Sequence, residues 1–164
     1  MPDLKPISRE AIPAALAKVE RYRLLNEPEQ AESICQDILR ADPENQPALV
    51  ALILALTDQL AGVAARVGEA QELLSRLRGE YERAYYTGIV SERRARALLQ
   101  QGGSGFIAYD WIRDAMKCYE KAEAIRPPGN DDAVLRWNTC QRFLIRHPHL
   151  EPAPEEQAEP LPLE

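Results

Sequence analysis

The only two histidines of the chain, His147 and His149, flank Pro148 and lie close to Glu151. Imidazole and carboxylate groups are ligands that several metals accept. A useful metal site also needs a rigid second shell that orients its ligands, and a tail segment does not supply one. The rest of the chain has no histidine, so the usual Ser–His–Asp, Cys–His and HExxH arrangements are not available there. We therefore expect no metal, no cofactor and no catalytic residue.

A glycine-rich stretch, GGSG at 102–105, precedes an expected helix, where backbone N–H groups could cradle a phosphate. The stretch lacks the GxxxxGK[ST] frame of a phosphate-binding loop, and no strand precedes it. We interpret it as a connector. Asp131–Asp132 is interpreted as a helix cap, because negative charge at a helix N-terminus is favourable, and Glu155–Glu156 as part of a solvated tail.

Arginines crowd the middle of the sequence, and five glutamates interleave with them. The arginines are Arg66, Arg76, Arg78, Arg83, Arg93, Arg94 and Arg96, and the glutamates are Glu69, Glu72, Glu80, Glu82 and Glu92. One interpretation is a set of solvated helix faces with i,i+4 ion pairs, such as Glu72–Arg76 and Glu92–Arg96. The alternative is a surface for an anionic peptide or a phosphate, because guanidinium groups match carboxylates in geometry.

The charge of the 164-residue chain is unevenly distributed along it. The net charge is -6, but five acidic residues and no Lys or Arg follow His147, so the body is close to neutral. This balance gives no support for binding nucleic acid. Three cysteines without CxxC spacing argue against a disulfide framework or a zinc site. No signal peptide and no apolar run of membrane-spanning length are present, so a cytoplasmic location is expected.

Apolar residues recur at spacings of three and four along most of the chain, which predicts helices on a common core. No segment shows the alternation typical of a strand. Prolines and glycines divide the pattern. The expected helices cover about 8–25, 29–40, 46–61, 69–77, 80–100, 108–125 and 131–146. The segment HPHLEPAPEEQAEPLPLE at 147–164 is rich in Pro and Glu, which predicts a disordered tail after a domain of residues 1–146.

One residue pattern occurs twice with identical spacing. Ala31, Cys35, Ile38 and Pro43 are separated by four, three and five residues, and so are Ala115, Tyr119, Ala122 and Pro127. The pattern resembles the second helix of a tetratricopeptide repeat, in which a small Ala permits close helix contact and a Pro ends the helix. Tyr22 stands where this family places its first-helix Tyr, and Ala70 occupies the Ala position of an irregular middle repeat.

The resemblance implies an all-α, right-handed stack of antiparallel helix pairs, with about three repeats and a C-terminal capping helix. Two departures stand out. Ala15, Lys18 and Val19 replace the family's usual Trp, Leu and Gly, and the intervals from Ala31 to Ala70 and from Ala70 to Ala115 exceed the family period. The middle repeats therefore carry extra residues.

A helical stack of this kind implies a non-catalytic module that binds a peptide or helix of a partner protein on its concave face. The candidate contacts lie on the first helices of the pairs. They are Leu16, Glu20 and Arg23, then Val50, Leu54 and Thr57, and finally Arg83, Arg93 and Arg94. One alternative is a subunit docked permanently in a larger assembly through its apolar third helix and long fifth helix. Another is that Val50 and Leu54 are simply core. The partner's identity and the oligomeric state are left open.

Overall fold

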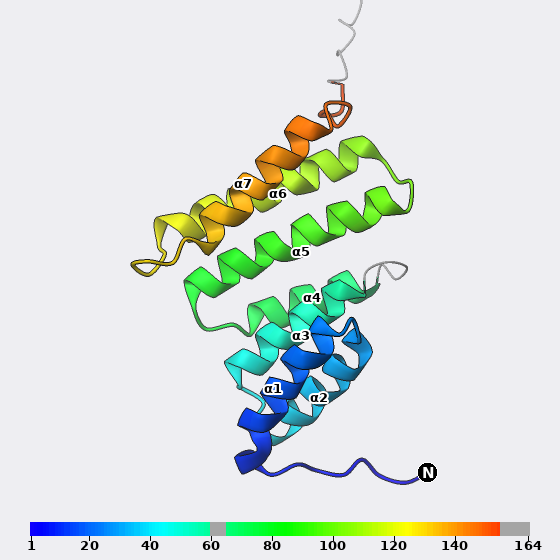
Figure 1. Ribbon diagram of the computed structural model, residues 1–164, viewed down its shortest axis with the longest axis vertical. Coiled ribbons are helices and arrows are strands. Elements are labelled where there is room, and N and C mark those ends of the chain that lie inside the picture. The colour runs from blue at the N-terminus through cyan, green and yellow to red at the C-terminus, as the bar shows by residue number, and fades with distance from the viewer. Residues whose placement is uncertain (60–64, 155–164) are drawn as a thin grey trace, which may run out of the picture.

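The computed structural model describes residues 1–59 and 65–154, and this part of the chain is all-α (Figure 1). Its helices are α1 (Ile12–Leu24), α2 (Pro28–Ala41), α3 (Gln46–Asp58), α4 (Ala65–Ser75), α5 (Glu80–Gln100), α6 (Gly105–Ala124) and α7 (Asp132–Arg146). A short 3-10 turn, Arg9–Ala11, precedes α1. The all-α prediction is confirmed, and the described residues contain no strand. No described helix combines the length and apolarity needed to cross a membrane.

Local sequence signals explain where several helices begin. The side chain of Asn45 accepts a hydrogen bond from the Ala48 N–H, and Ser104 accepts one from Ile107, so each caps a helix N-terminus. Ser104 thereby gives the GGSG stretch a structural role at the start of α6. Asn130 accepts from the N–H of Asp132, the first residue of α7. Ser8 precedes the 3-10 turn, but its side chain makes no capping bond.

Consecutive helices pack against one another along the chain, and the odd-numbered helices also meet. α1 contacts α3, and α3 contacts α5. The most extensive interface joins α5 to α6. In Figure 1, α5 lies between α3 and α4 on one side and α6 and α7 on the other. We call α1, α3, α5 and α7 the odd layer, and α2, α4 and α6 the even layer.

Two hydrophobic cores follow from this arrangement. The first is built from α1 to α4 and includes Val90 of α5, and the second is built from α5, α6 and α7. Side chains of α3 and α5 tie the cores together. Leu54 of α3 packs against the second core, and Tyr86 of α5 packs against both. The α3–α5 contact is therefore a main junction of the molecule.

The apolarity of α3 on most sides is explained within the chain. Seven of its residues are buried, and it contacts α1, α2, α4 and α5. A helix surrounded in this way has apolar residues on several faces for its own neighbours. An external partner is not needed to cover it.

The residues of the twice-repeated pattern lie at helix contacts. Ala31, Cys35, Ile38, Ala115, Tyr119 and Ala122 are all 0% exposed, and so is Ala70 of α4. Tyr22 is half-buried against the first core. Pro43 and Pro127 are exposed and follow the ends of α2 and α6.

The packed body continues past the expected boundary at residue 146. Leu150 is only 5% exposed, and its Cδ2 atom lies 3.3 Å from the position that a Cβ on Gly105 would occupy. His147 is ordered by a contact between its Nδ1 and the Phe143 carbonyl oxygen. Packing within the described chain therefore extends past residue 146 to Leu150, and residues 155–164 of the predicted tail lie outside the described part of the chain.

Candidate binding face

Two of the predicted contact residues, Arg23 and Arg93, converge on one aspartate at the end of α3. Asp58 accepts from Arg23 Nε of α1 at 2.8 Å and from Arg93 Nη1 of α5 at 2.7 Å. Arg93 also donates to the hydroxyl of Thr57 at 2.7 Å and to the carbonyl of Leu54 at 3.1 Å. Three odd-layer helices are thus linked by one set of charge-assisted hydrogen bonds.

The position of Arg93 has a structural reason. The carbonyl groups in the last turn of a helix have no partner within the helix, and the C-terminal end carries partial negative charge. Arg93 supplies a cation and a donor at this end of α3. The expectation that Thr57 contacts a partner is corrected here. Thr57 is 5% exposed, because its hydroxyl donates to the Leu54 carbonyl and accepts from Arg93.

A second charged cluster is centred on Glu92, the residue that precedes Arg93 on α5. The carboxylate of Glu92 is 2% exposed and accepts from the Tyr119 hydroxyl at 2.8 Å and from Arg96 Nε at 3.1 Å. Arg136 of α7 lies 3.6 Å from the same carboxylate. The expected Glu92–Arg96 pair is present, but its carboxylate lies in the core instead of on a solvated face. A buried carboxylate is tolerated because its oxygen atoms are bonded and its charge is balanced.

The absence of a side chain at Gly88 permits this cluster to form. A Cβ on Gly88 would lie 2.5 Å from the ring of Tyr119, so glycine is required for α6 to approach α5 this closely. Burial, followed by the charge of Glu92, raises the pKa of Tyr119 above its usual range. Tyr119 therefore stays protonated and remains a hydrogen-bond donor to Glu92.

The two clusters influence each other electrostatically. Burial lowers the pKa of Arg93, Asp58 opposes this shift, and the nearby charges of Arg23 and Arg136 lower the pKa further. Around Arg93, four guanidinium groups (those of Arg23, Arg93, Arg96 and Arg136) face two carboxylates, those of Asp58 and Glu92. We call these six residues the arginine cluster, and it has an excess of positive charge.

A surface hollow of about 290 Å³ opens beside this cluster. Glu20, Arg23, Leu24 and Asp58 line it together with the α1–α2 turn. Leu24 is 84% exposed, which is unusual for a large apolar side chain. This hollow brings together two of the predicted contacts, Glu20 and Arg23, with an apolar neighbour that the sequence pattern did not single out.

The other predicted contacts are placed differently. Leu16 and Val50 are half-buried against the first core, and Leu54 is half-buried against the second. Arg83 donates to the carbonyls of Leu77 and Arg78 and so holds the α4–α5 connection. Arg94 stacks on the ring of Trp111, with its Cζ atom 3.7 Å from the ring centroid. These residues therefore pack within the chain, and Arg83 and Arg94 lie apart from the arginine cluster.

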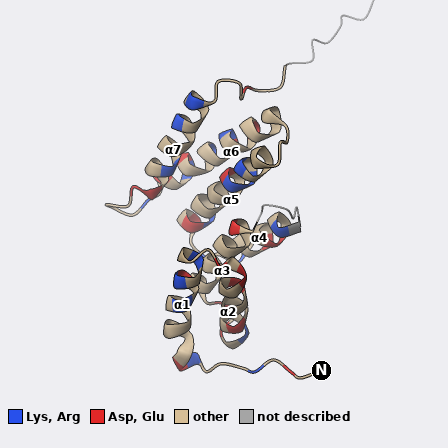
Figure 2. Ribbon diagram, turned by 45° about the vertical axis from the view of Figure 1, so that its right-hand side comes forward, with Lys and Arg blue, Asp and Glu red and all other residues tan. Residues whose placement is uncertain are grey.

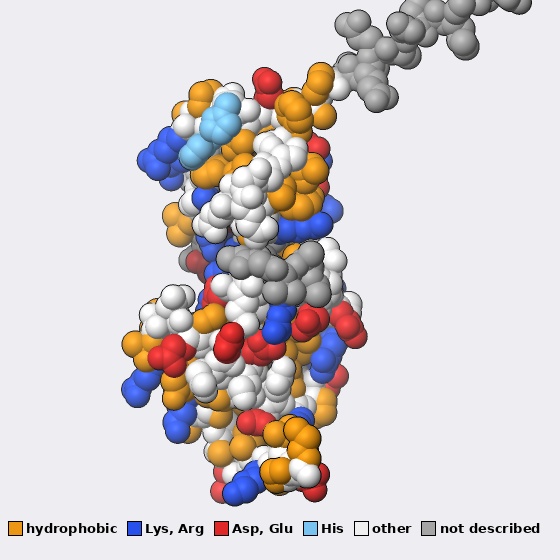
Figure 3. Space-filling view, turned by 90° about the vertical axis from the view of Figure 1, so that its right-hand side faces the viewer, with side chains coloured by type: hydrophobic (Ala, Val, Ile, Leu, Met, Phe, Trp, Pro, Cys, Tyr) orange, Lys and Arg blue, Asp and Glu red, His pale blue; other side chains and the backbone are white. Residues whose placement is uncertain are grey.

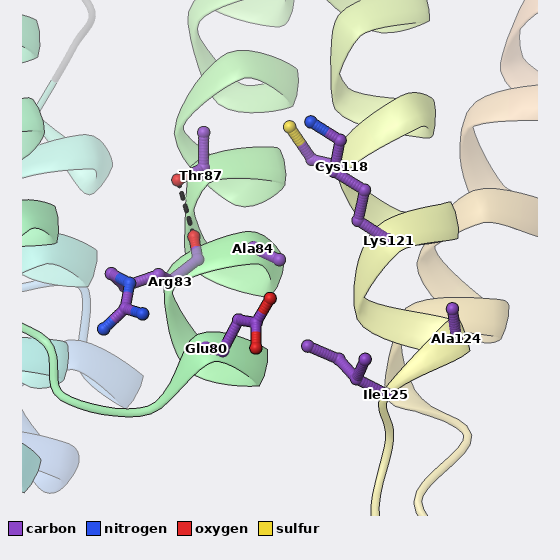
Figure 4. A pocket seen from close by; sticks show the side chains of 8 residues that line it. All are labelled: Glu80, Arg83, Ala84, Thr87, Cys118, Lys121, Ala124 and Ile125. Atoms are coloured by element: carbon purple, nitrogen blue, oxygen red, sulfur yellow. Dashed lines mark hydrogen bonds between the residues drawn. The ribbon is translucent and has the colours of Figure 1, made fainter.

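A larger groove of about 470 Å³ runs between α5 and α6 (Figure 4). Its lining includes Glu80, Thr87, Cys118 and Lys121, and Thr87 donates to the Arg83 carbonyl. Burial raises the pKa of the Cys118 thiol, which makes it a poorer nucleophile. None of the eight lining residues is a histidine that could activate the thiol. The groove therefore offers no catalytic pair.

The two histidines interact with each other and with an aromatic neighbour. The ring centroids of His147 and His149 lie 5.7 Å apart, and His147 packs on Phe143 at 4.2 Å. Within residues 1–59 and 65–154, no group of three His, Cys, Asp or Glu side chains is placed to hold a metal ion. Comparison with protein-family models, curated proteins and solved structures finds no match to this chain.

Proposed function

We propose that the chain is a non-catalytic protein-interaction module of tetratricopeptide-like type, which binds a peptide or helix of a partner on its odd-layer face. The support is the convergence of Arg23, Asp58 and Arg93 from α1, α3 and α5 beside a surface hollow. This arrangement combines a rigid polar platform with an exposed leucine. Protein interfaces commonly combine an apolar anchor with polar groups of fixed geometry.

Two further observations favour transient binding over permanent docking. The polar side chains near the hollow are held by one another, which fixes their orientation toward a partner. The apolar third helix, which motivated the docked-subunit alternative, is covered by α1, α2, α4 and α5. The twice-repeated Ala pattern, buried at helix contacts, supports the tetratricopeptide-like assignment.

The proposal is tested by comparing capture of partners by variants of the two layers. Leu24→Ser changes the odd-layer hollow without touching a charged residue. Ile125→Ser makes the same kind of change at the end of α6, where Ile125 is 44% exposed. Full-length wild type and both variants serve as bait in a cell lysate, and captured proteins are quantified by mass spectrometry.

The expected result is a set of proteins that wild type and the α6 variant capture and that the α1 variant loses. All substituted positions are exposed, so melting temperatures should stay close to that of wild type. Equal capture by both variants would contradict an odd-layer binding face.

A further inference from the structure

The two helix layers carry opposite net charge. The odd layer contains ten Lys and Arg and six Asp and Glu, whereas the even layer contains five Lys and Arg and nine Asp and Glu. Figure 2 shows basic residues recurring along α1, α5 and α7, and acidic residues on α2. The near-neutral body is therefore a charge-polarised one, with a surplus of four positive charges on one layer and of four negative charges on the other.

The acidic side of the molecule is also visible at its surface. Glu32, Glu69 and Glu72 line a hollow between α2 and α4, and acidic side chains gather around the middle of the face in Figure 3. Arg66 pairs with Glu32 and Glu69, and Arg76 lines the same hollow, so the surplus of negative charge there is small. A charge asymmetry of this kind orients an approaching charged partner and increases its rate of encounter.

The positive charge of the odd layer is concentrated in the arginine cluster. Asp58 is shared by Arg23 and Arg93, and Glu92 is shared by Arg96 and Arg136, so each carboxylate leaves one guanidinium charge uncompensated. Burial is the main cause that lowers the pKa of Arg93, and the repulsion of the Arg23 and Arg136 charges adds to it. An additional carboxylate in this region would relieve that repulsion.

The cluster is accessible as well as charged. The side chains of Arg23 and Arg136 are 23% and 33% exposed. Among residues 1–59 and 65–154, Arg23 is bonded through Nε alone, which leaves its two terminal nitrogens to an acceptor at the hollow. Leu24 and Leu25, at 84% and 59% exposed, provide apolar surface next to it.

We infer that the odd-layer face binds an acidic segment of a partner protein, whose Asp or Glu side chains pair with Arg23 and Arg136 while an apolar residue packs on Leu24. This inference rests on the proposed function and names the partner class. One positive guanidinium charge is left uncompensated beside Asp58 and one beside Glu92. Two separate positive charges suit single Asp or Glu side chains spaced along a peptide. Nucleic acid fits less well, because the even layer and the whole chain are acidic.

The test uses the full chain and fluorescein-labelled synthetic peptides in which Leu alternates with Glu, Gln or Lys. Fluorescence anisotropy measures binding at low and at moderate salt. Wild type should bind the Glu/Leu peptide, with affinity falling as salt rises, and should bind the Gln/Leu and Lys/Leu peptides weakly. Arg23→Gln with Arg136→Gln should reduce the affinity about ten-fold.

A matched double variant controls for net charge. Arg40→Gln with Arg113→Gln removes the same charge from exposed positions of the even layer and should retain wild-type affinity. Circular dichroism checks that each variant is folded, and Arg23→Gln alone gives an intermediate loss if the double variant is not. Equal loss in both double variants would overturn the site, since it would show a general charge effect.

Two other outcomes overturn the partner class. If the Glu/Leu peptide does not bind while lysate capture still depends on Leu24, the proposed function stands and the acidic partner is wrong. A full-length variant with Glu155, Glu156, Glu159 and Glu164 changed to Gln tests the chain's own acidic segment. Peptide binding seen only in that variant would assign the site to this segment instead of a partner.

Discussion

Glu92 shows which contacts of a residue a local sequence pattern can predict and which it cannot. The i,i+4 spacing predicted its pair with Arg96 correctly, because both residues lie on one helix. The hydroxyl of Tyr119 comes from another helix, 27 residues away, and meets Glu92 only through the α5–α6 packing. Glu92 shares one face of α5 with Gly88 and Ala95, and all three residues are buried. Its place on this face is the sequence feature from which its burial could have been predicted.

Gly88 is the residue on which the α5–α6 contact depends. Gly88→Ala places a Cβ 2.5 Å from the rigid ring of Tyr119, so either the ring or a helix must move. We expect the free energy of unfolding to fall by about 1–3 kcal/mol, the usual cost of overpacking. Gly68→Ala in α4 is the control, because nothing lies within 4 Å of its Cβ position. Ala should raise stability there by roughly 0.5–1 kcal/mol. Urea denaturation measures both, and equal effects would contradict the close contact.

The buried thiols give stability a dependence on alkaline pH. Burial raises the pKa of Cys35 and of Cys140 from 9.0 to about 12. Between these values the unfolded chain loses the thiol proton and the folded chain keeps it, so the free energy of unfolding falls as pH rises. At pH 10 each thiol should account for a loss of about 1 kcal/mol that is absent below pH 8.

Urea denaturation at pH 8 and pH 10 measures this effect in wild type and in Cys35→Ala. The variant should lose less stability between the two pH values than wild type does, whatever its stability at pH 8. Cys118→Ala is the control, because Cys118 is half-buried and its pKa is less strongly raised. An unchanged difference in Cys35→Ala would contradict a buried, protonated thiol.

At the scale of helices, local pattern predicted most boundaries and could not predict contacts. The spacing of apolar residues located all seven helices, since burial of one stripe is a property of a single segment. Arg23, Leu54, Thr57 and Arg93 were nominated as surface contacts because they lie on odd-numbered helices. The bonds of Arg93 to Leu54 and Thr57, and of both arginines to Asp58, depend on the α1–α3–α5 packing, which a helix pattern does not encode.

The C-terminal end shows the same limit. Composition placed the end of the domain at residue 146, because proline and glutamate dominate the residues that follow. One leucine within such a segment can still dock, and Leu150 does so against the start of α6. A single apolar residue has no periodicity that would distinguish it from the exposed leucines of a tail.

Leu150→Asp should therefore destabilise the body. Burying a leucine side chain stabilises a fold by about 1.5–3 kcal/mol, and this contribution would be lost. Ile145→Asp is the matched control on α7, since Ile145 is 67% exposed. Thermal unfolding followed by circular dichroism should show a lower midpoint for the first variant alone. Equal midpoints would show that the docking of Leu150 contributes nothing to stability.

At the scale of the whole molecule, the chain consists of two cores joined through α5. Stacked helical repeats unfold together only when the interfaces between neighbours are strong enough to couple them. Here the coupling includes the packing of Leu54 on the second core and the bonds of Arg93 to the end of α3. The proposed binding face and this junction share Arg93 and Asp58, so a partner bound there should also strengthen the coupling.

Weakening this junction should separate the unfolding of the two halves. Both tryptophans, Trp111 and Trp137, belong to α6 and α7, so their fluorescence reports on the second half, whereas far-ultraviolet circular dichroism reports on all helices. In wild type the two signals should change at the same urea concentration. In Leu54→Ala with Arg93→Gln we expect two different midpoints, because the contacts that couple the cores are reduced.

The control for this double variant is Leu24→Ala with Arg113→Gln, the same chemical changes at positions that are exposed and do not join the cores. It should unfold like wild type by both signals. If the two midpoints remain equal in Leu54→Ala with Arg93→Gln, other contacts must couple the halves. The interface of α4 with α5 and the packing of Val90 in the first core would then be sufficient to hold the stack together.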